Sequence, residues 1–191
     1  MECPEFNVIG LAFPGVPGFP HFGHNDEVAW CITHGMADDT DVFVETESLE
    51  AVEWNSELVR VRGHGDVEVF CGSTDRGPVV IGDPADGMAL SVAWTGLIGQ
   101  DTTFEALQPM LAASNCEELE DSVRPWVIPV NNLLTADRSG DISFKIRGRV
   151  VERPPGNRWT PVPGNAEHAW SGIEPVPFEQ LPGLRNPERG F

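Results

Sequence analysis

The chain has 191 residues, of which 40% are hydrophobic and 22% charged, and these values are typical of a folded protein with a buried core. Thirty acidic residues oppose twelve basic ones, and the formal net charge of -18 excludes nucleic acid and anionic membrane surfaces as partners because they would repel the chain. No run of about 18 apolar residues is present to span a membrane, and the residues after Met1 do not have the pattern of a signal peptide.

Short strands are predicted through the first hundred residues. Proline and glycine between Pro14 and Gly18 prevent a helix, so residues 1–30 are predicted to form strand, turn and strand. Apolar runs or polar–apolar alternation then predict six further strands, at residues 28–33, 41–45, 58–62, 67–70, 78–81 and 89–94. The strands at 58–62 and 67–70 are predicted to form a hairpin.

The hydrophobic period changes after residue 100. Thr102 precedes Glu105 and Ser114 precedes Glu117 at the spacing of a capping box, and each pair opens an amphipathic stretch. Two short helices are therefore predicted within residues 102–126.

A strand-like pattern returns after Pro129. Residues 132–135 and 142–146 flank a polar turn and predict another hairpin. From Glu152 onward, prolines are too frequent for any strand ladder except at a sheet edge, so an irregular arm is expected. The prediction is one α+β unit with a mostly antiparallel sheet, divided into strand-rich 1–100, helical 101–126, hairpin 127–150 and arm 151–191.

Cysteine and histidine give little sign of a reactive centre. The cysteines have no CxxC spacing that would favour a zinc or redox site, and they are interpreted as small buried side chains. Neither His24 nor His34 has a serine or cysteine nearby in a nucleophile motif. His64 lies in the turn of the hairpin predicted at 58–70 and is expected to be exposed. Four aromatic residues are interpreted as core rather than pocket wall: Phe13, Phe19, Trp30 and Phe43.

Residues 38–41, with the sequence Asp-Asp-Thr-Asp, are the most unusual polar segment. Calcium prefers clustered oxygen ligands, and Asp38, the carbonyl of Thr40 and Asp41 could supply them from one turn. A solvated acidic turn is the other interpretation, and the residues alone favour it. Asn132 is likewise interpreted, on its position before a hairpin, as a turn-capping residue.

A longer series of motifs runs along the chain. Pro14 to Gly18 leads into Gly23-His24-Asn25, and then come Trp30, Thr33 and the segment Asp38 to Asp41. This series, in order and spacing, resembles the penicillin acylase family. Further matches follow over essentially the whole chain: Thr74 to Val79, Ala93-Trp94-Thr95, Pro129, Asn132, Ala136-Asp137, Gly148 to Arg153, Trp170 to Gly172, Leu181-Pro182, Asn186-Pro187 and Gly190.

The resemblance implies an N-terminal-nucleophile hydrolase fold, of which this chain would be an internal, incomplete piece of the β chain. In this family a serine at the start of the β chain attacks an amide carbonyl, with its own α-amino group as the base. No serine of this chain matches that nucleophile, so the chain alone is expected to be inactive. The implied partners are a small amide substrate, an α chain and the rest of the β chain, and the implied location is the periplasm or the cell exterior.

The resemblance also implies roles for particular residues. The backbone N–H of His34 and the carboxamide of Asn132 match the two donors of an oxyanion hole, and Arg153 matches a residue of the supporting hydrogen-bond network. Asp38, Thr40 and Asp41 match positions that bind calcium in some members, so calcium is the implied cofactor, with no organic one. Two departures from the family pattern are Val151, in place of the usual proline, and Cys31, in place of glycine.

The implied reaction is removal of an acyl group from an amide such as a β-lactam antibiotic or an acyl-homoserine lactone. An acylase for lipopeptides or other long-chain amides is the alternative among enzymes. A non-catalytic truncated product, or a binding domain stabilised by calcium, is the alternative of a different class. A serine encoded in frame upstream, after a processing site, would favour the enzyme.

Overall fold

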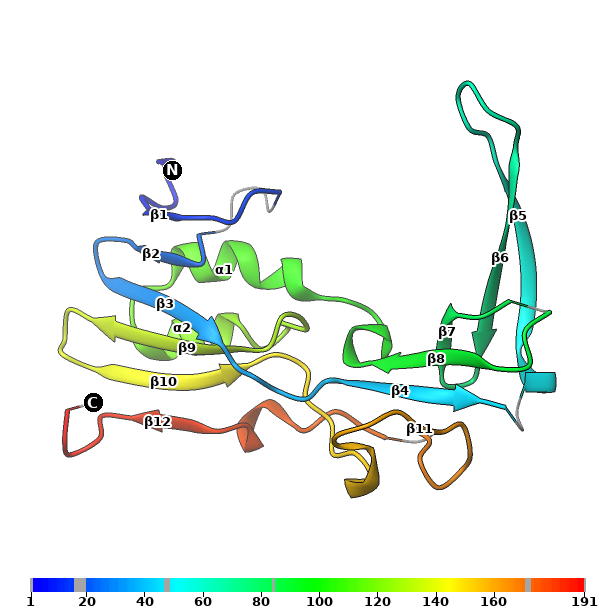
Figure 1. Ribbon diagram of the computed structural model, residues 1–191. Helices are drawn as coiled ribbons and strands as arrows, with labels where there is room; N and C mark the ends of the chain where they lie inside the picture. The colour runs from blue at the N-terminus through cyan, green and yellow to red at the C-terminus, as the bar shows by residue number, and fades with distance from the viewer. Residues whose placement is uncertain (1, 16–19, 47–48, 84, 171–172, 191) are drawn as a thin grey trace. The chain divides into compact units, whose positions relative to one another are not determined.

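The computed structural model describes residues 2–15, 20–46, 49–83, 85–170 and 173–190. Contacts within the chain fall into two compact units. Unit 1 comprises Met1–Ala37, Gly99–Val150 and Pro175–Phe191, and unit 2 comprises Asp38–Ile98 and Val151–Glu174. Each unit contains one six-stranded sheet (Figure 1). The predicted α+β class, with mostly antiparallel strands and two short helices, is confirmed, whereas the single-domain prediction stays a prediction.

The sheet of unit 1 is antiparallel throughout, in the order β1-β2-β3-β9-β10-β12. Its members are β1 Ile9–Leu11, β2 Phe22–His24, β3 Val28–His34, β9 Asn131–Asp137, β10 Ile142–Arg147 and β12 Gly183–Arg185. The predicted strands over 28–33, 132–135 and 142–146 are all present. The two strands expected within residues 1–30 pair as β1 and β2.

Two helices follow a 3₁₀ turn at Thr103–Ala106, as the change of period predicted: α1 spans Leu107–Ala112 and α2 spans Cys116–Ser122. The predicted caps are wrong in detail. The side chain that caps α2 is Asn115, whose oxygen accepts from the N–H of Glu118, and Ser114 instead donates its hydroxyl to the Glu118 carboxylate at 2.6 Å. The side chain of Thr102 makes no cap bond and instead donates its hydroxyl to the Pro125 carbonyl.

The helices cover one face of the unit 1 sheet (Figure 1), and that face forms the core. Side chains alternate across a strand, so Val28, Trp30 and Ile32 of β3 point to the helices and are buried. Leu119 of α2 and Leu133 of β9 complete the centre of this core. The remaining side chains of each strand point to the opposite face of the sheet. This open face holds the candidate site.

Unit 2 contains the second sheet, in the order β11-β4-β8-β7-β6-β5. β11 runs parallel to β4, and the other pairs are antiparallel. The strands are β4 Thr40–Glu45, β5 Glu53–Val59, β6 Val67–Thr74, β7 Gly77–Ile81, β8 Ala89–Trp94 and β11 Val162–Pro163. The strands predicted at 41–45, 67–70, 78–81 and 89–94 are present, and His64 is exposed as expected. The strand predicted at 58–62 is misplaced: β5 begins at Glu53 and ends at Val59, although it forms the predicted hairpin with β6.

The proline-rich arm is less irregular than predicted. Its residues 151–174 belong to unit 2 and contribute β11, while residues 175–191 belong to unit 1 and contribute β12. Both strands lie at the edge of their sheet, which is where the proline content allows a strand to form. Among the helices that the structure describes, none has the length and apolar character needed to cross a membrane.

Some predictions of burial are wrong. Cys31 and Cys71 are exposed rather than buried, because they occupy exposed positions of β3 and β6, and Cys3 is only partly buried, whereas Cys116 is buried as predicted. Phe13 is 53% exposed and is not part of the core, while Trp30 and Phe43 are buried. The prediction for Phe19 lies outside the described residues.

Asp137, at the end of β9, organises the turn between β9 and β10. Its carboxylate accepts hydrogen bonds from the hydroxyl and N–H of Ser139 and from the N–H groups of Asp141 and Cys116. The hydrogen bond from the Ser139 hydroxyl, followed by those from the backbone, lowers the pKa of Asp137 to about 2.

This depressed pKa makes a prediction for acid stability. Since the folded state holds the carboxylate charged, Asp137 stabilises the fold above its ordinary pKa, and this contribution is lost as the pH falls toward 2. Asp137→Asn is expected to lower the thermal midpoint at pH 6 and to flatten its decline between about pH 4 and 2. The control is Asp26→Asn, at an exposed position of the β2–β3 turn. Parallel Tm–pH curves for wild type and Asp137→Asn would contradict the prediction.

Candidate active site

The two predicted oxyanion donors come from neighbouring strands of unit 1. β3 and β9 pair so that Thr33 lies opposite Asn132 and His34 lies opposite Asn131. The Nδ2 of Asn132 donates to the Thr33 hydroxyl at 2.8 Å and to the His34 carbonyl at 3.2 Å. The antiparallel register therefore brings the Asn132 carboxamide against the backbone of His34, although the two residues are far apart in sequence.

The direction of the His34 N–H follows from the ladder. Hydrogen-bonded and non-hydrogen-bonded pairs alternate along antiparallel strands. The N–H of Gly35 donates to the Val130 carbonyl at 2.9 Å, so His34 belongs to a non-hydrogen-bonded pair and its N–H points to the edge of β3 away from β9. β2 pairs with Ala29 and Trp30 of β3, and its described ladder ends before His34.

Asn132 projects from the open face of the sheet. It alternates along β9 with the buried Asn131 and Leu133, and it stays partly exposed. Both N–H groups of its carboxamide are used within the chain, so a substrate oxygen would have to replace one acceptor. The hydrogen bond to the His34 carbonyl, at 3.2 Å, is longer and weaker than the one to the Thr33 hydroxyl.

Thr33 was not among the predicted site residues, although its hydroxyl orients the Asn132 carboxamide. Thr33 is part of the family pattern, but its contact with Asn132 depends on the register of two strands. A hydroxyl on the exposed face of a strand, opposite a polar amide, was the available signal.

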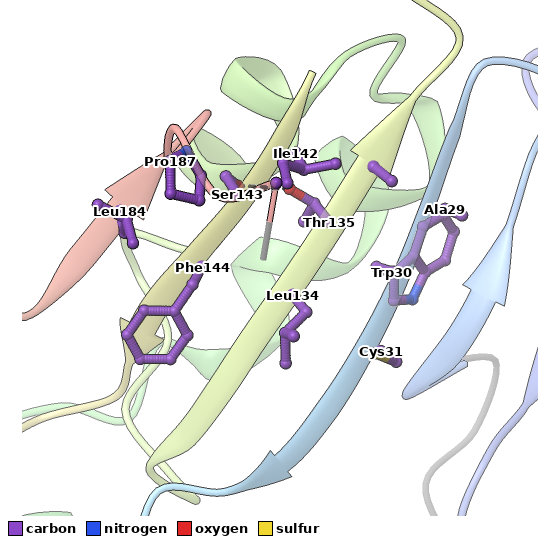
Figure 2. A pocket seen from close by; sticks show the side chains of 12 residues that line it. Ala29, Trp30, Cys31, Leu134, Thr135, Ile142, Ser143, Phe144, Leu184 and Pro187 are labelled. Carbon is purple, nitrogen blue, oxygen red and sulfur yellow. Dashed lines mark hydrogen bonds between the residues drawn. The ribbon is translucent and has the colours of Figure 1, made fainter. Parts of the chain in front are cut away.

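An apolar hollow of about 470 Å³ lies on the same open face. Figure 2 shows Cys31 of β3, Leu134 of β9, Phe144 of β10 and Leu184 of β12 on adjacent strands along this face. Cys31 lies opposite Leu134 in the β3–β9 pair, and Thr33 and Asn132 are the next residues on this face of those strands. The candidate oxyanion donors thus lie next to a largely apolar surface.

Asn25 has a structural role in the turn that leads into β3. Its Oδ1 accepts from the N–H groups of Glu27 and Val28, and its Nδ2 donates to the Ala113 carbonyl at 2.7 Å. These bonds fix the turn between β2 and β3. They tie the start of β3 to the segment after α1.

The remaining predicted site residues meet in unit 2. The guanidinium of Arg153 contacts the carboxylates of Asp38 and Asp41 and donates to the Thr40 carbonyl at 3.3 Å. These three partners belong to unit 2, and they are the residues predicted to bind calcium. Asn157 and Trp170, which also donate to Asp41, were not predicted.

This arrangement does not fit a calcium ion. Calcium takes six to eight oxygen ligands at about 2.3–2.6 Å, but here a positively charged guanidinium faces the three candidate oxygens. No group of three or more metal-binding side chains occurs among the described residues. Calcium binding at this turn stays a prediction, and the contacts of Arg153 argue against it.

Comparison with known proteins decides the family. A family model described as penicillin amidase matches residues 1–191. The chain belongs to the penicillin amidase family. It is 38% identical, over 100% of its length, to the penicillin acylase 2 proenzyme of Pseudomonas sp. strain SE83, of which it covers 26%. The penicillin acylase resemblance is therefore confirmed.

Other relatives of the chain differ in the substrates that their names give. Penicillin G acylase of Escherichia coli is 29% identical over 95% of this chain, and the acyl-homoserine lactone acylase QuiP of Pseudomonas putida is 27% identical over 95%. The structure of a thermostable penicillin G acylase from Alcaligenes faecalis matches with a TM-score of 0.82 and 26% identity, over 100% of this chain and 36% of that one. The chain spans about a quarter of the length of these curated relatives.

Proposed function

We propose that this chain is part of an amidohydrolase that removes an acyl group from an amide, and that it supplies the oxyanion hole. The observation that carries the proposal is the contact of the Asn132 carboxamide with Thr33 and with the His34 peptide. A carboxamide and a backbone N–H next to each other at a partly open surface are the donors that a tetrahedral intermediate requires. The family of the chain supports this chemistry.

Each group has a part in the proposed reaction. The amide carbonyl of the substrate approaches Asn132 from the open face, because the side chain projects from that face. Attack by a nucleophile turns the carbonyl carbon tetrahedral and puts negative charge on its oxygen. The Nδ2–H of Asn132 and the N–H of His34 stabilise that charge, and Thr33 holds the carboxamide in place.

The nucleophile is proposed to be a serine from another part of the full-length polypeptide, acting with its own α-amino group as the base. No serine of this chain matches the family nucleophile. The proposed partners are accordingly an α chain and the rest of the β chain. The proposed location is the periplasm or the cell exterior.

The proposed substrates are β-lactam antibiotics with an acyl side chain or acyl-homoserine lactones, since relatives of both kinds match this chain. Purified full-length enzyme should release the acyl group from at least one member of a panel with aromatic, dicarboxylic and aliphatic acyl groups. Liquid chromatography of the free acid and the free amine would measure it. A variant of the family nucleophile serine is the control, and the 191-residue chain alone should show no turnover.

The two rival functions give different results in this assay. A preference for acyl chains of twelve or more carbons on a peptide amine would favour the long-chain alternative. No acyl release from any member of the panel by correctly folded full-length protein would contradict the enzymatic proposal and favour a non-catalytic product.

A further inference from the structure

The turn at residues 38–41 already contains a cation supplied by the chain itself. The guanidinium of Arg153 reaches two carboxylates from one side, one Nη on Asp38 and the other on Asp41. The second Nη also donates to the Thr40 carbonyl at 3.3 Å. A planar guanidinium with several N–H donors suits this set of oxygens, because it can bind two carboxylates at the same time.

The Asp41 carboxylate is committed to further donors from the same segment as Arg153. Its Oδ2 accepts from the Asn157 carboxamide at 2.7 Å and from the Trp170 indole at 2.6 Å. The Asp41 side chain is 1% exposed and that of Arg153 is 9% exposed. Buried charges of this kind are stable only when they are paired and hydrogen-bonded, and this carboxylate is both.

A divalent ion and this guanidinium would compete for the same place. Calcium would have to take oxygen lone pairs that now accept from Arg153, and it would be repelled by the positive charge of the displaced side chain. We propose that Arg153 is the resident cation of this turn, and that it takes the place of calcium in joining residues 38–41 to the 153–170 segment of unit 2. This inference does not rest on the proposed function.

Calcium and chelator can be used to test this proposal, because the site is reachable from solvent. Asp38 is 49% exposed at its side chain, and a hollow of about 390 Å³ is lined by Asp38, Arg153 and Arg158. The full-length enzyme would be treated with EGTA and desalted, and its thermal midpoint would be measured with EGTA and with added CaCl₂. The wild type is expected to show the same midpoint, within about 1 °C, in both conditions.

Variants of Arg153 provide the second part of the test. Arg153→Ala is expected to lower the thermal midpoint by about 5 °C or more, since it leaves the buried Asp41 charge without its cation. Arg153→Lys keeps the positive charge but cannot bind both carboxylates as the guanidinium does, so a smaller decrease of the midpoint is expected. This variant replaces the alanine variant in the test if the latter does not fold. Arg158→Ala is the matched control, because Arg158 is exposed and lines the same hollow.

Chemical rescue gives a readout that a general packing defect would not show. Guanidinium chloride at about 10 mM, far below denaturing concentrations, should raise the midpoint of Arg153→Ala and leave the wild type unchanged. The proposal is overturned if EGTA lowers the wild-type midpoint and Asp38→Asn removes that sensitivity, or if Arg153→Ala and Arg153→Lys both melt with the wild type. If EGTA lowers the midpoint of Asp38→Asn as it does that of the wild type, the calcium is bound elsewhere in the protein. The midpoints of the Arg153 variants then decide whether the proposal holds.

Discussion

Replacement of Asn132 with alanine in the full-length enzyme is expected to lower kcat by about 100- to 1000-fold, which is the usual cost of removing one oxyanion-hole donor. The physical reason is that the donor acts on charge that develops only in the transition state, so KM should change little. Steady-state kinetics with the best substrate of the acyl panel would measure both constants.

Two controls separate electrostatics from packing in this experiment. Asn132→Asp keeps the shape of the side chain but replaces its donor with a negative charge, and it is expected to lose at least as much activity as the alanine variant. Asn55→Ala removes an exposed asparagine of β5 and should keep kcat within about two-fold. Near-wild-type activity of Asn132→Asp would contradict the assigned role.

Replacement of Glu45 with alanine is expected to lower the free energy of unfolding by about 3–5 kcal/mol, because it leaves the buried Arg76 with the exposed Asp75 as its remaining ion-pair partner in place of a buried carboxylate. Glu45 is fully buried at the end of β4, and the Nε and Nη2 of Arg76 each donate to one of its carboxylate oxygens at 2.8 Å. Ser91 donates to the same carboxylate at 2.6 Å. The hydrogen bond to Glu45 raises the pKa of Arg76. Urea unfolding would measure the loss.

The buried pair also predicts an asymmetry between single and double replacements. Exchanging both Glu45 and Arg76 for methionine should cost less than the loss of Glu45 alone, because no charge is then left unpaired. Glu57→Ala, at an exposed position of β5, is the matched control and should change stability by less than about 0.5 kcal/mol. An equal effect of Glu45→Ala and Glu57→Ala would show that the pair does not stabilise unit 2.

Local pattern was sufficient to predict most of the elements. The strand at 89–94 was predicted with its observed bounds, and the strand at 28–33 was predicted to within one residue, since both are short apolar runs with clear ends. The cap of α2 was misassigned because Asn115 follows Ser114 directly, and either side chain can begin a helix. The division of the chain into two units could not be predicted, because it depends on contacts between distant segments.

The candidate site was only partly predictable for the same reason. Motif resemblance indicated His34 and Asn132, but Thr33 became a site residue only through the β3–β9 register. Spacing suggested that Asp38 and Asp41 share a ligand, yet it could not reveal that Arg153, more than a hundred residues later, reaches both. A charged partner brought in by tertiary structure leaves no local signal in the sequence around a carboxylate.

The most direct test of the oxyanion-hole assignment is a structure of the full-length enzyme with a tetrahedral transition-state analogue, such as a boronic acid that carries the preferred acyl group. The account predicts that one oxygen of the analogue lies about 2.7–3.1 Å from both the Nδ2 of Asn132 and the backbone nitrogen of His34, with the contact between Asn132 and the His34 carbonyl released. An analogue oxygen that is bound by other donors, with Asn132 still bonded to His34 and Thr33, would contradict it.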